Sequence, residues 1–169
     1  GASNTAIGKD ALLTNTTASN NTAVGNLSLK LTTTGAANTA VGYRAMEDNT
    51  TGTCNTSVGC AALVTNTTGR YNSAFGKESL GANTTGEENV AVGIHALQAN
   101  TTANKNTAVG ASAMVVNTTG AENSAFGGEA LDANTTGACN TAVGFASLSA
   151  NTTAIDNVAV GFAALKSNT

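Results

Sequence analysis

The side chains that could do acid–base or metal chemistry are few and scattered in this sequence. His95 is the only histidine. Glu78 occupies the same position in the preceding unit of the repeat that is described below. The carboxylate pairs Glu47-Asp48 and Glu87-Glu88 are isolated, whereas cleavage of a glycosidic bond needs two carboxylates that converge on that bond. No spacing of His and Cys fits a zinc site. We therefore expect no catalytic residue, no metal site, no cofactor and no enzyme activity, and we expect His95 and Glu78 to form a surface pair.

Three cysteines, Cys54, Cys60 and Cys139, leave at least one thiol without a partner in the chain. Cys54 and Cys139 occupy the same position of the repeat and lie five units apart. At the spacing of stacked strands this is roughly 24 Å, too far for a disulfide. Cys60 follows Cys54 across an extended segment, which disfavours that pair. We interpret the three as small space-filling thiols, with a crosslink between chains as the alternative.

The triplet Asn-Thr-Thr is a possible acceptor for N-linked glycans, and most of its copies share one position of the repeat. Glycans on every copy would stand about 4.8 Å apart and crowd severely. Ladders of asparagine amides are the other interpretation, and it is the one that we favour. The candidate glycosylation residues are Asn15, Asn49, Asn66, Asn83, Asn100, Asn117, Asn134 and Asn151.

These residues belong to an internal repeat, typified by Asn38-Thr39-Ala40-Val41-Gly42, that fills the chain from residue 1 to residue 169 as one array. Its 17-residue period is constant, without insertion or deletion, so function must be read by repeat position. We number each unit from its first Asn and use "column" for the residues that share a position. The ten units begin at Asn4, Asn21, Asn38, Asn55, Asn72, Asn89, Asn106, Asn123, Asn140 and Asn157.

The repeat predicts an all-β fold, a parallel β-solenoid of ten 17-residue turns. Columns one to four alternate polar and apolar residues around a β-branched one and end at Gly, which indicates a short strand. Columns seven to ten predict a second strand, and Asn-Thr-Thr-Gly predicts a wide corner. Stacking then places each residue over its equivalent in the next unit. Low aromatic content and 19 glycines suit such an object better than a rounded core.

Columns four and nine are apolar in every unit, so we expect them to form the buried core. The predicted core residues are Val24, Val41, Val58, Phe75, Val92, Val109, Phe126, Val143, Leu29, Leu63, Leu80, Leu97, Leu131 and Leu148. Two such residues per turn bury too little to offset the entropy of ordering the whole turn. We therefore expect a homo-oligomer that shares the fibre axis. Columns three and eight stay small in every unit and are candidates for the oligomer face. The alternative is a monomer whose small columns merely fit a narrow interior. The predicted oligomer face in column three is Ala40, Ala74, Ala91, Ala108, Ala125 and Ala142.

The charged residues all lie in columns six, seven, ten, eleven, sixteen and seventeen, which we expect to face water. Stacking predicts four pairs of opposite charge: Lys30 with Glu47, Arg70 with Glu87, and Lys105 with both Glu88 and Glu122. Exposed pairs contribute only about 0 to 1 kcal/mol each, so we interpret them as a device that opposes slippage between turns.

Net charge is −3 with no basic stripe, so the sequence does not suggest a nucleic acid partner. It contains no apolar run of about 18 residues that would span a membrane. Both ends fall inside a unit, without a capping repeat, and this predicts a part of a longer fibre or a subunit that stacks end to end into a filament.

Ranks of Thr supply a second functional hypothesis. Columns thirteen and fourteen are Thr wherever the chain reaches them, as at Thr84 and Thr85, and regular Thr ranks on a parallel coil could bind ice or a carbohydrate surface. Adjacent residues of an extended chain point to opposite sides, so both ranks are not expected on one flat face. Hydrogen bonding within the turns is the plainer interpretation of these threonines.

The unit Asn-Thr-Ala-Val-Gly-x-x-Ala-Leu resembles the head repeats of YadA-like trimeric autotransporter adhesins, and it resembles arrays in phage tail fibres more closely. The resemblance covers all ten units. It implies a left-handed parallel β-roll, three chains to a fibre, and attachment at a cell or virion surface to an unknown receptor or glycan. We therefore expect a non-enzymatic, extracellular, structural or adhesive fibre module, with the ice- or carbohydrate-binding solenoid as the alternative.

Overall fold

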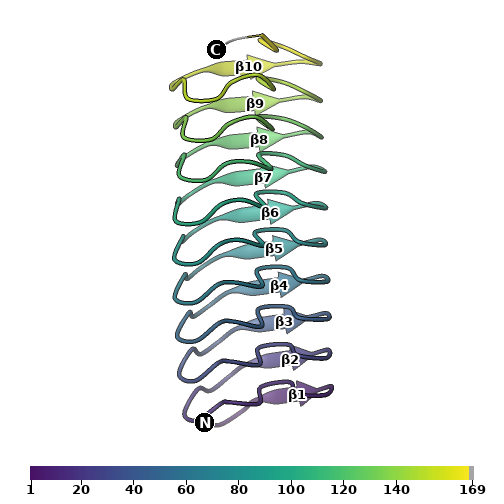
Figure 1. Ribbon diagram of the computed structural model, residues 1–169, viewed down its shortest axis with the longest axis vertical. Coiled ribbons are helices and arrows are strands. Elements are labelled where there is room, and N and C mark those ends of the chain that lie inside the picture. The colour runs from purple at the N-terminus through teal and green to yellow at the C-terminus, as the bar shows by residue number, and fades with distance from the viewer. Residues whose placement is uncertain (168–169) are drawn as a thin grey trace.

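The computed structural model describes residues 1–167 as a stack of similar turns, each with one three-residue strand (Figure 1). The ten strands form a single parallel sheet in chain order, and this confirms the predicted β-solenoid. Their bounds are β1 Thr5–Ile7, β2 Thr22–Val24, β3 Thr39–Val41, β4 Thr56–Val58, β5 Ser73–Phe75, β6 Val90–Val92, β7 Thr107–Val109, β8 Ser124–Phe126, β9 Thr141–Val143 and β10 Val158–Val160.

Neighbouring strands are aligned so that residues one repeat unit apart pair with each other. Thr39 pairs with Thr56 and Val41 with Val58, and every other pair of neighbouring strands is aligned in the same way. Each column is therefore a continuous stripe along the stack. Slippage by one residue would move the strand's inward side chains to the outside, so the buried columns hold this register.

The predicted second strand is absent from residues 1–167, because two residues of that segment have left-handed backbone. Columns seven, nine and seventeen have φ between 48° and 63° throughout the described part of the chain. None of these residues is Val, Ile or Thr, the types that this conformation disfavours most. Column five is Gly throughout, with φ between 127° and 141°. A Cβ at Gly42 would collide with the carbonyl of Gly59 in the next turn.

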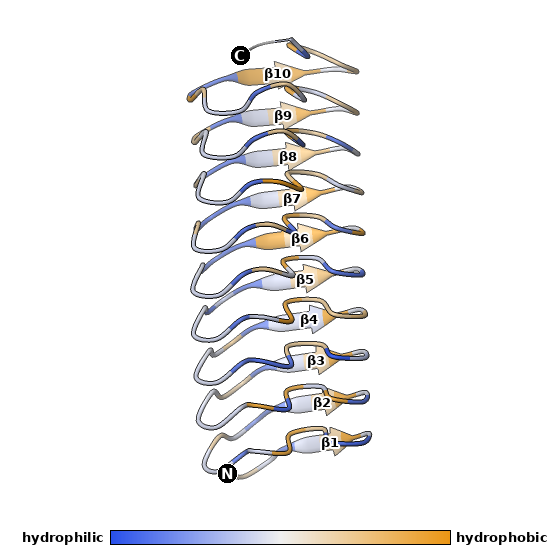
Figure 2. Ribbon diagram, in the orientation of Figure 1, coloured by the Kyte–Doolittle hydropathy of each residue, from blue (hydrophilic) through white to orange (hydrophobic). Residues whose placement is uncertain are grey.

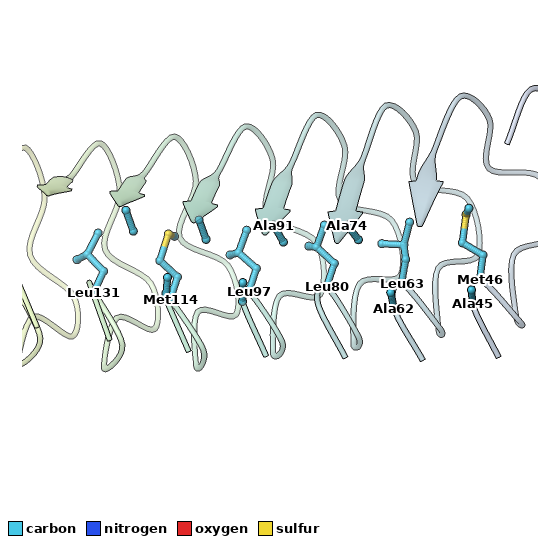
Figure 3. Close-up of a cluster of buried hydrophobic side chains, with 14 of the residues drawn as sticks. Ala45, Met46, Ala62, Leu63, Ala74, Leu80, Ala91, Leu97, Met114 and Leu131 are labelled. Atoms are coloured by element: carbon cyan, nitrogen blue, oxygen red, sulfur yellow. The ribbon is translucent and has the colours of Figure 1, made fainter. Parts of the chain in front are cut away.

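The core is a narrow channel between the sheet and the segment that returns behind it. Column nine supplies the large side chains, and from Leu29 to Leu148 all of them are fully buried. The alanines of the strands point at them: Figure 3 shows Ala74 and Ala91 directed toward Leu80 and Leu97. Column eight, which includes Ala62, completes this cluster. One large residue per turn therefore fills the interior, with two small residues around it.

The orientation of the strand is thus the reverse of the prediction. The predicted core residues of column four, Val24, Val41, Val58, Phe75, Val92, Val109, Phe126 and Val143, lie on the outside and are half-buried or exposed. The predicted oligomer face of column three, Ala40, Ala74, Ala91, Ala108, Ala125 and Ala142, is completely buried. The physical reason is space: a close-packed channel already holding Leu has room for a methyl group from the strand but not for a second branched side chain.

Two buried asparagine ladders add side-chain hydrogen bonds to the backbone bonds that the return segment makes between turns, such as Leu97 N–H to the Ala113 carbonyl at 3.0 Å. In column one, each Asn Oδ1 accepts the backbone N–H of the Asn one turn later at 2.8–3.0 Å. In column twelve, the amide nitrogens from Asn66 to Asn151 donate to the Oδ1 one turn earlier at 2.8–3.1 Å. Both ladders also donate to the carbonyl of column fifteen, as Asn38 and Asn49 do to Gly52. The predicted amide ladders are confirmed.

The candidate glycosylation residues are the column-twelve ladder. Asn49, Asn66, Asn83, Asn100, Asn117, Asn134 and Asn151 are buried, and Asn15 is half-buried. An amide that donates inside the coil cannot carry a glycan without leaving it, because a bulky sugar must stand at the surface. The folded chain therefore does not offer this column for glycosylation.

Candidate binding surface on the outer face of the sheet

The outer face of the sheet consists of columns two and four, which point away from the core in every strand. From β3 to β9 the column-four residues, such as Val58 and Phe126, are 36–43% exposed, except Val109, which is half-buried. Figure 2 colours the ribbon by hydropathy, and the arrowheads of successive strands, where column four lies, are orange to pale orange. Column two is half-buried Thr, Ser or Val from β2 to β9. Neither column contains a charged residue in any turn.

The dimensions of this outer face follow from sheet geometry. Ten strands about 4.8 Å apart give a length of about 43 Å, and two columns on one face give a width of roughly 12 Å with their side chains. The area is thus on the order of 500 Å². This is comparable with the largest apolar patches on monomeric proteins, which are often functional.

The charged columns lie elsewhere and pair largely as predicted. Lys30 approaches Glu47 to 3.7 Å, and Lys105 approaches Glu122 to 3.8 Å. Arg70 Nε donates to Glu87 at 3.1 Å. The fourth predicted pair, Glu88 with Lys105, forms no ion pair in the part of the chain that the structure describes. Glu88 is exposed, so water solvates its carboxylate.

The two threonine ranks differ in the way that strand alternation predicts. Column thirteen is bonded: from Thr16 to Thr135 each hydroxyl donates to the carbonyl of the Thr one turn later at 2.9–3.2 Å. Column fourteen, from Thr17 to Thr153, is exposed throughout. Its hydroxyls make no hydrogen bond within residues 1–167. Only one rank therefore offers hydroxyls to a ligand, and it lies in the corner rather than on the sheet.

The predicted pair of His95 and Glu78 is present, with 3.5 Å between Nε2 and Oε2. Glu78 also accepts a hydrogen bond from Gln98 at 2.8 Å and lies 3.1 Å from Lys77 Nζ. Glu78 and Gln98 border a hollow of about 360 Å³. Its other lining residues are Arg44, Ala61, Val64, Thr65, Gly81 and Ala82.

One hydroxyl and one carboxylate line this hollow, those of Thr65 and Glu78. The only hydroxyl that lines it belongs to Thr65, and it donates to the Gly81 carbonyl at 2.8 Å. No Ser or Cys is among the lining residues. The Thr65 hydroxyl is thus bonded to the backbone, and the Glu78 carboxylate is held by Gln98 and His95.

Two carboxyl groups of the surface have perturbed protonation. Burial raises the pKa of Asp132, and burial together with the neighbouring Glu47 raises the pKa of Asp48. Neither lies in a cluster of three or more His, Cys, Asp or Glu side chains that could hold a metal ion, since residues 1–167 contain no such cluster.

The cysteines do not fill interior space as predicted. Cys54, Cys60 and Cys139 are free and exposed. Cys54 and Cys139 are in column seventeen, which faces outward at the corner, and Cys60 is in column six. They are therefore surface thiols.

The outer face is the candidate surface that sequence reasoning missed, although the sequence contained a signal for it. Column three admits only Ala or Ser, whereas column four accepts Val, Ile and Phe. A position restricted to the smallest side chains is typical of a tight interior, and a position that tolerates Phe is typical of an open side. Restricted volume, rather than hydrophobicity, was the signal for burial here.

Comparison of the chain with protein-family models, with curated proteins and with solved structures finds no match in any of the three. Residues 1–167 also contain no helix of the length and apolarity needed to cross a bilayer. The functional interpretation therefore depends on the geometry of the coil and on the residues that it exposes.

Proposed function

We propose that this chain is a non-enzymatic structural or adhesive fibre module that assembles with identical copies through the outer face of its sheet. Three chains around a shared axis, end-to-end stacking of such modules, an extracellular place on a cell or virion surface, and attachment to a receptor or glycan all belong to this proposal. The observation that supports it best is the uncharged, partly apolar strip that columns two and four maintain through ten turns.

A copy of the same chain is the partner that fits this strip. The strip repeats once per turn, so a partner needs the same rise of about 4.8 Å to make equivalent contacts along its length. One face-to-face contact on the order of 500 Å² per chain is smaller than the roughly 800 Å² of a typical stable partner surface. We favour three chains over a pair because the repeat unit resembles those of trimeric adhesins.

Sedimentation equilibrium tests the assembly. The expected mass is three times the 16.5 kDa of one chain. Val92→Asp places a charge on the strip and should yield a folded species of 16.5 kDa. Thr85→Asp is the matched control, because Thr85 is also exposed but lies in the corner. A wild-type chain that sediments as a monomer at all concentrations would refute assembly through this face.

Column fourteen favours a second candidate function, binding of ice or of a carbohydrate surface. Its hydroxyls are regularly spaced, exposed and unbonded within residues 1–167. Thermal hysteresis of a monomeric chain, abolished by replacing Thr85, Thr102 and Thr119 with Lys, would support that function over the fibre. Unchanged freezing behaviour together with a trimeric mass would exclude it in favour of the first.

A further inference from the structure

Two strands of the sheet, β5 and β8, depart from the rest on the outer face, and both depart in the same way. Column four is Phe only in these strands, at Phe75 and Phe126. Column two is Ser only in these strands, at Ser73 and Ser124. The other eight strands combine Thr or Val with Val or Ile. The larger residue therefore always occurs beside the smaller one, in the same turn.

This pairing indicates that the outer face is packed in the functional protein. A side chain that faces water is not limited in volume, whereas a close-packed contact resists each added carbon. Phe75 and Phe126 are 41% and 43% exposed, slightly more than Val58 and Val92 at 36% and 37%. The rings thus extend outward from the sheet toward whatever covers it. Serine in the same strand removes a methyl group beside each ring and makes part of the room that the ring needs.

The two Phe strands also distinguish the levels of the covering surface. If the partner were shifted by one turn, each Phe would face the column-four residue of β4, β6, β7 or β9, which is Val in all four strands. Without a shift, the rings of neighbouring copies meet at the same level, where aromatic side chains pack favourably against one another. The Ser of each chain makes room for its own ring at that level.

The other turns of the strip are interchangeable, so only strands with different residues, such as β5 and β8, can fix the register between two chains. Sliding one chain past another by one turn, about 4.8 Å, would exchange each Thr–Val turn for an equivalent one at little cost. The Ser–Phe turns of β5 and β8 lie three turns apart, and they make the different vertical offsets unequal in energy. A shift of three turns would match only one of the two Ser–Phe turns and would leave three turns at each end uncovered.

We propose that parallel copies of this chain meet through their outer faces without any vertical offset, and that Ser73–Phe75 and Ser124–Phe126 are the register keys. This inference rests on the proposed assembly through the outer face. The occupant of the strip is a second copy of the chain. Its strip has matching area, about 500 Å², and no charge, so parallel stacking brings no like charges together on this face.

Cysteine crosslinking measures the offset. The background carries Cys54→Ser, Cys60→Ser and Cys139→Ser, and the probes are Val92→Cys in β6 and Val109→Cys in β7. Chains without offset bring Val92→Cys next to its own copies, so that chain alone should form linked dimers under mild oxidation or with a short thiol crosslinker. A mixture of the two probe chains should give few mixed links. We expect like links to exceed mixed links by about tenfold or more, because an offset separates the Phe rings of neighbouring copies at both levels.

A second variant removes the keys. Ser73→Thr, Phe75→Val, Ser124→Thr and Phe126→Val make β5 and β8 resemble their neighbours, and the probes are placed in that chain. We expect it to keep its oligomeric mass while mixed links rise to a yield similar to that of like links. Thr85→Cys, in the corner, is the control position and should not link in either chain.

The outcomes separate this inference from the proposed function. A monomer in sedimentation would overturn both. An oligomer in which Val92→Cys links only to Val109→Cys would overturn the zero-offset register and leave the assembly in place, and it would indicate an offset or antiparallel arrangement. An oligomer without any link, or one whose links are unchanged when the keys are removed, would overturn the role of the two Phe strands.

Discussion

The buried asparagine ladder of column one should be the most sensitive polar element of the coil, and Asn106→Ala tests it. Asn106 is fully buried. Its Nδ2 donates to the carbonyl of Gly120 at 2.8 Å, and its Oδ1 accepts the backbone N–H of Asn123 at 2.9 Å. Its Oδ1 also accepts a weaker bond of 3.3 Å from Nδ2 of Asn123, which keeps its bond to the Gly137 carbonyl when Asn106 is replaced. The amide of Asn117 donates to the same Gly120 carbonyl at 2.9 Å. Removing the side chain therefore leaves the carbonyl with one donor but leaves the N–H of Asn123 with none.

The expected cost follows from that asymmetry. A buried N–H without an acceptor costs about 1–3 kcal/mol, and loss of one further hydrogen bond from a carbonyl that keeps another donor costs about 1 kcal/mol. Asn106→Ala should therefore lower the free energy of unfolding by about 2–4 kcal/mol. Asn26→Ala is the matched control, because Asn26 is in column six, is not buried, and makes no side-chain hydrogen bond within residues 1–167. Its cost should stay within about 0.5 kcal/mol.

Urea unfolding at one fixed chain concentration, followed by circular dichroism in the far ultraviolet, measures both variants. A fixed concentration is needed because assembly would otherwise contribute to the measured stability. If Asn106→Ala unfolded at the same urea concentration as Asn26→Ala, the ladder would not be a stabilising element, and the argument from unsatisfied backbone groups would fail for this coil.

Three further predictions concern the backbone, the core and protonation. Ala37 has φ of 58°, so Ala37→Val should lower the free energy of unfolding by about 1 kcal/mol or more, while Ala36→Val next to it should change little; equal effects in urea unfolding would contradict the left-handed assignment. Leu97→Ala should cost about 2–5 kcal/mol because Leu97 is fully buried, and Leu31→Ala, at a site that is 37% exposed, should cost far less; a reversed order would mean that column nine is not the core. Burial raises the pKa of Asp132, so the folded state favours its neutral form and loses this contribution as pH rises from the ordinary aspartate pKa through the raised one. Asp132→Asn should therefore stabilise the chain near pH 7 more than near pH 3, and a pH-independent difference in melting temperature would disprove that linkage.

Sequence reasoning reached the architecture because periodicity is a local property of the chain. An uninterrupted 17-residue period requires that Asn38 and Asn55 occupy equivalent places, and only stacked turns provide them. The charge pairs Lys30–Glu47 and Arg70–Glu87 follow from that stacking alone. The amide ladders follow too, since identical Asn residues at strand spacing can bond to one another.

The second element was predicted wrongly because apolar pattern does not report backbone handedness. Glu129-Ala130-Leu131-Asp132 reads as a strand by alternation, yet Glu129 and Leu131 have φ of 56° and 52°. The absence of β-branched residues from columns seven, nine and seventeen is the signal that would have revealed it. This signal lies in the residue types that are missing from these columns, and a pattern of hydrophobicity does not reveal which types are missing.

The sequence by itself determined the number of turns, their period, their parallel register and the separation of charged from uncharged columns. Only the tertiary structure decided which side of the strand faces inward. Alternation separates the Ala of column three from the Val of column four, but both are apolar, and burial of either would satisfy the pattern. The choice depends on the space left by the segment that returns behind the sheet. Leu97 and its equivalents fill that space, so the strand contributes its methyl groups to the core and turns its valines and phenylalanines outward.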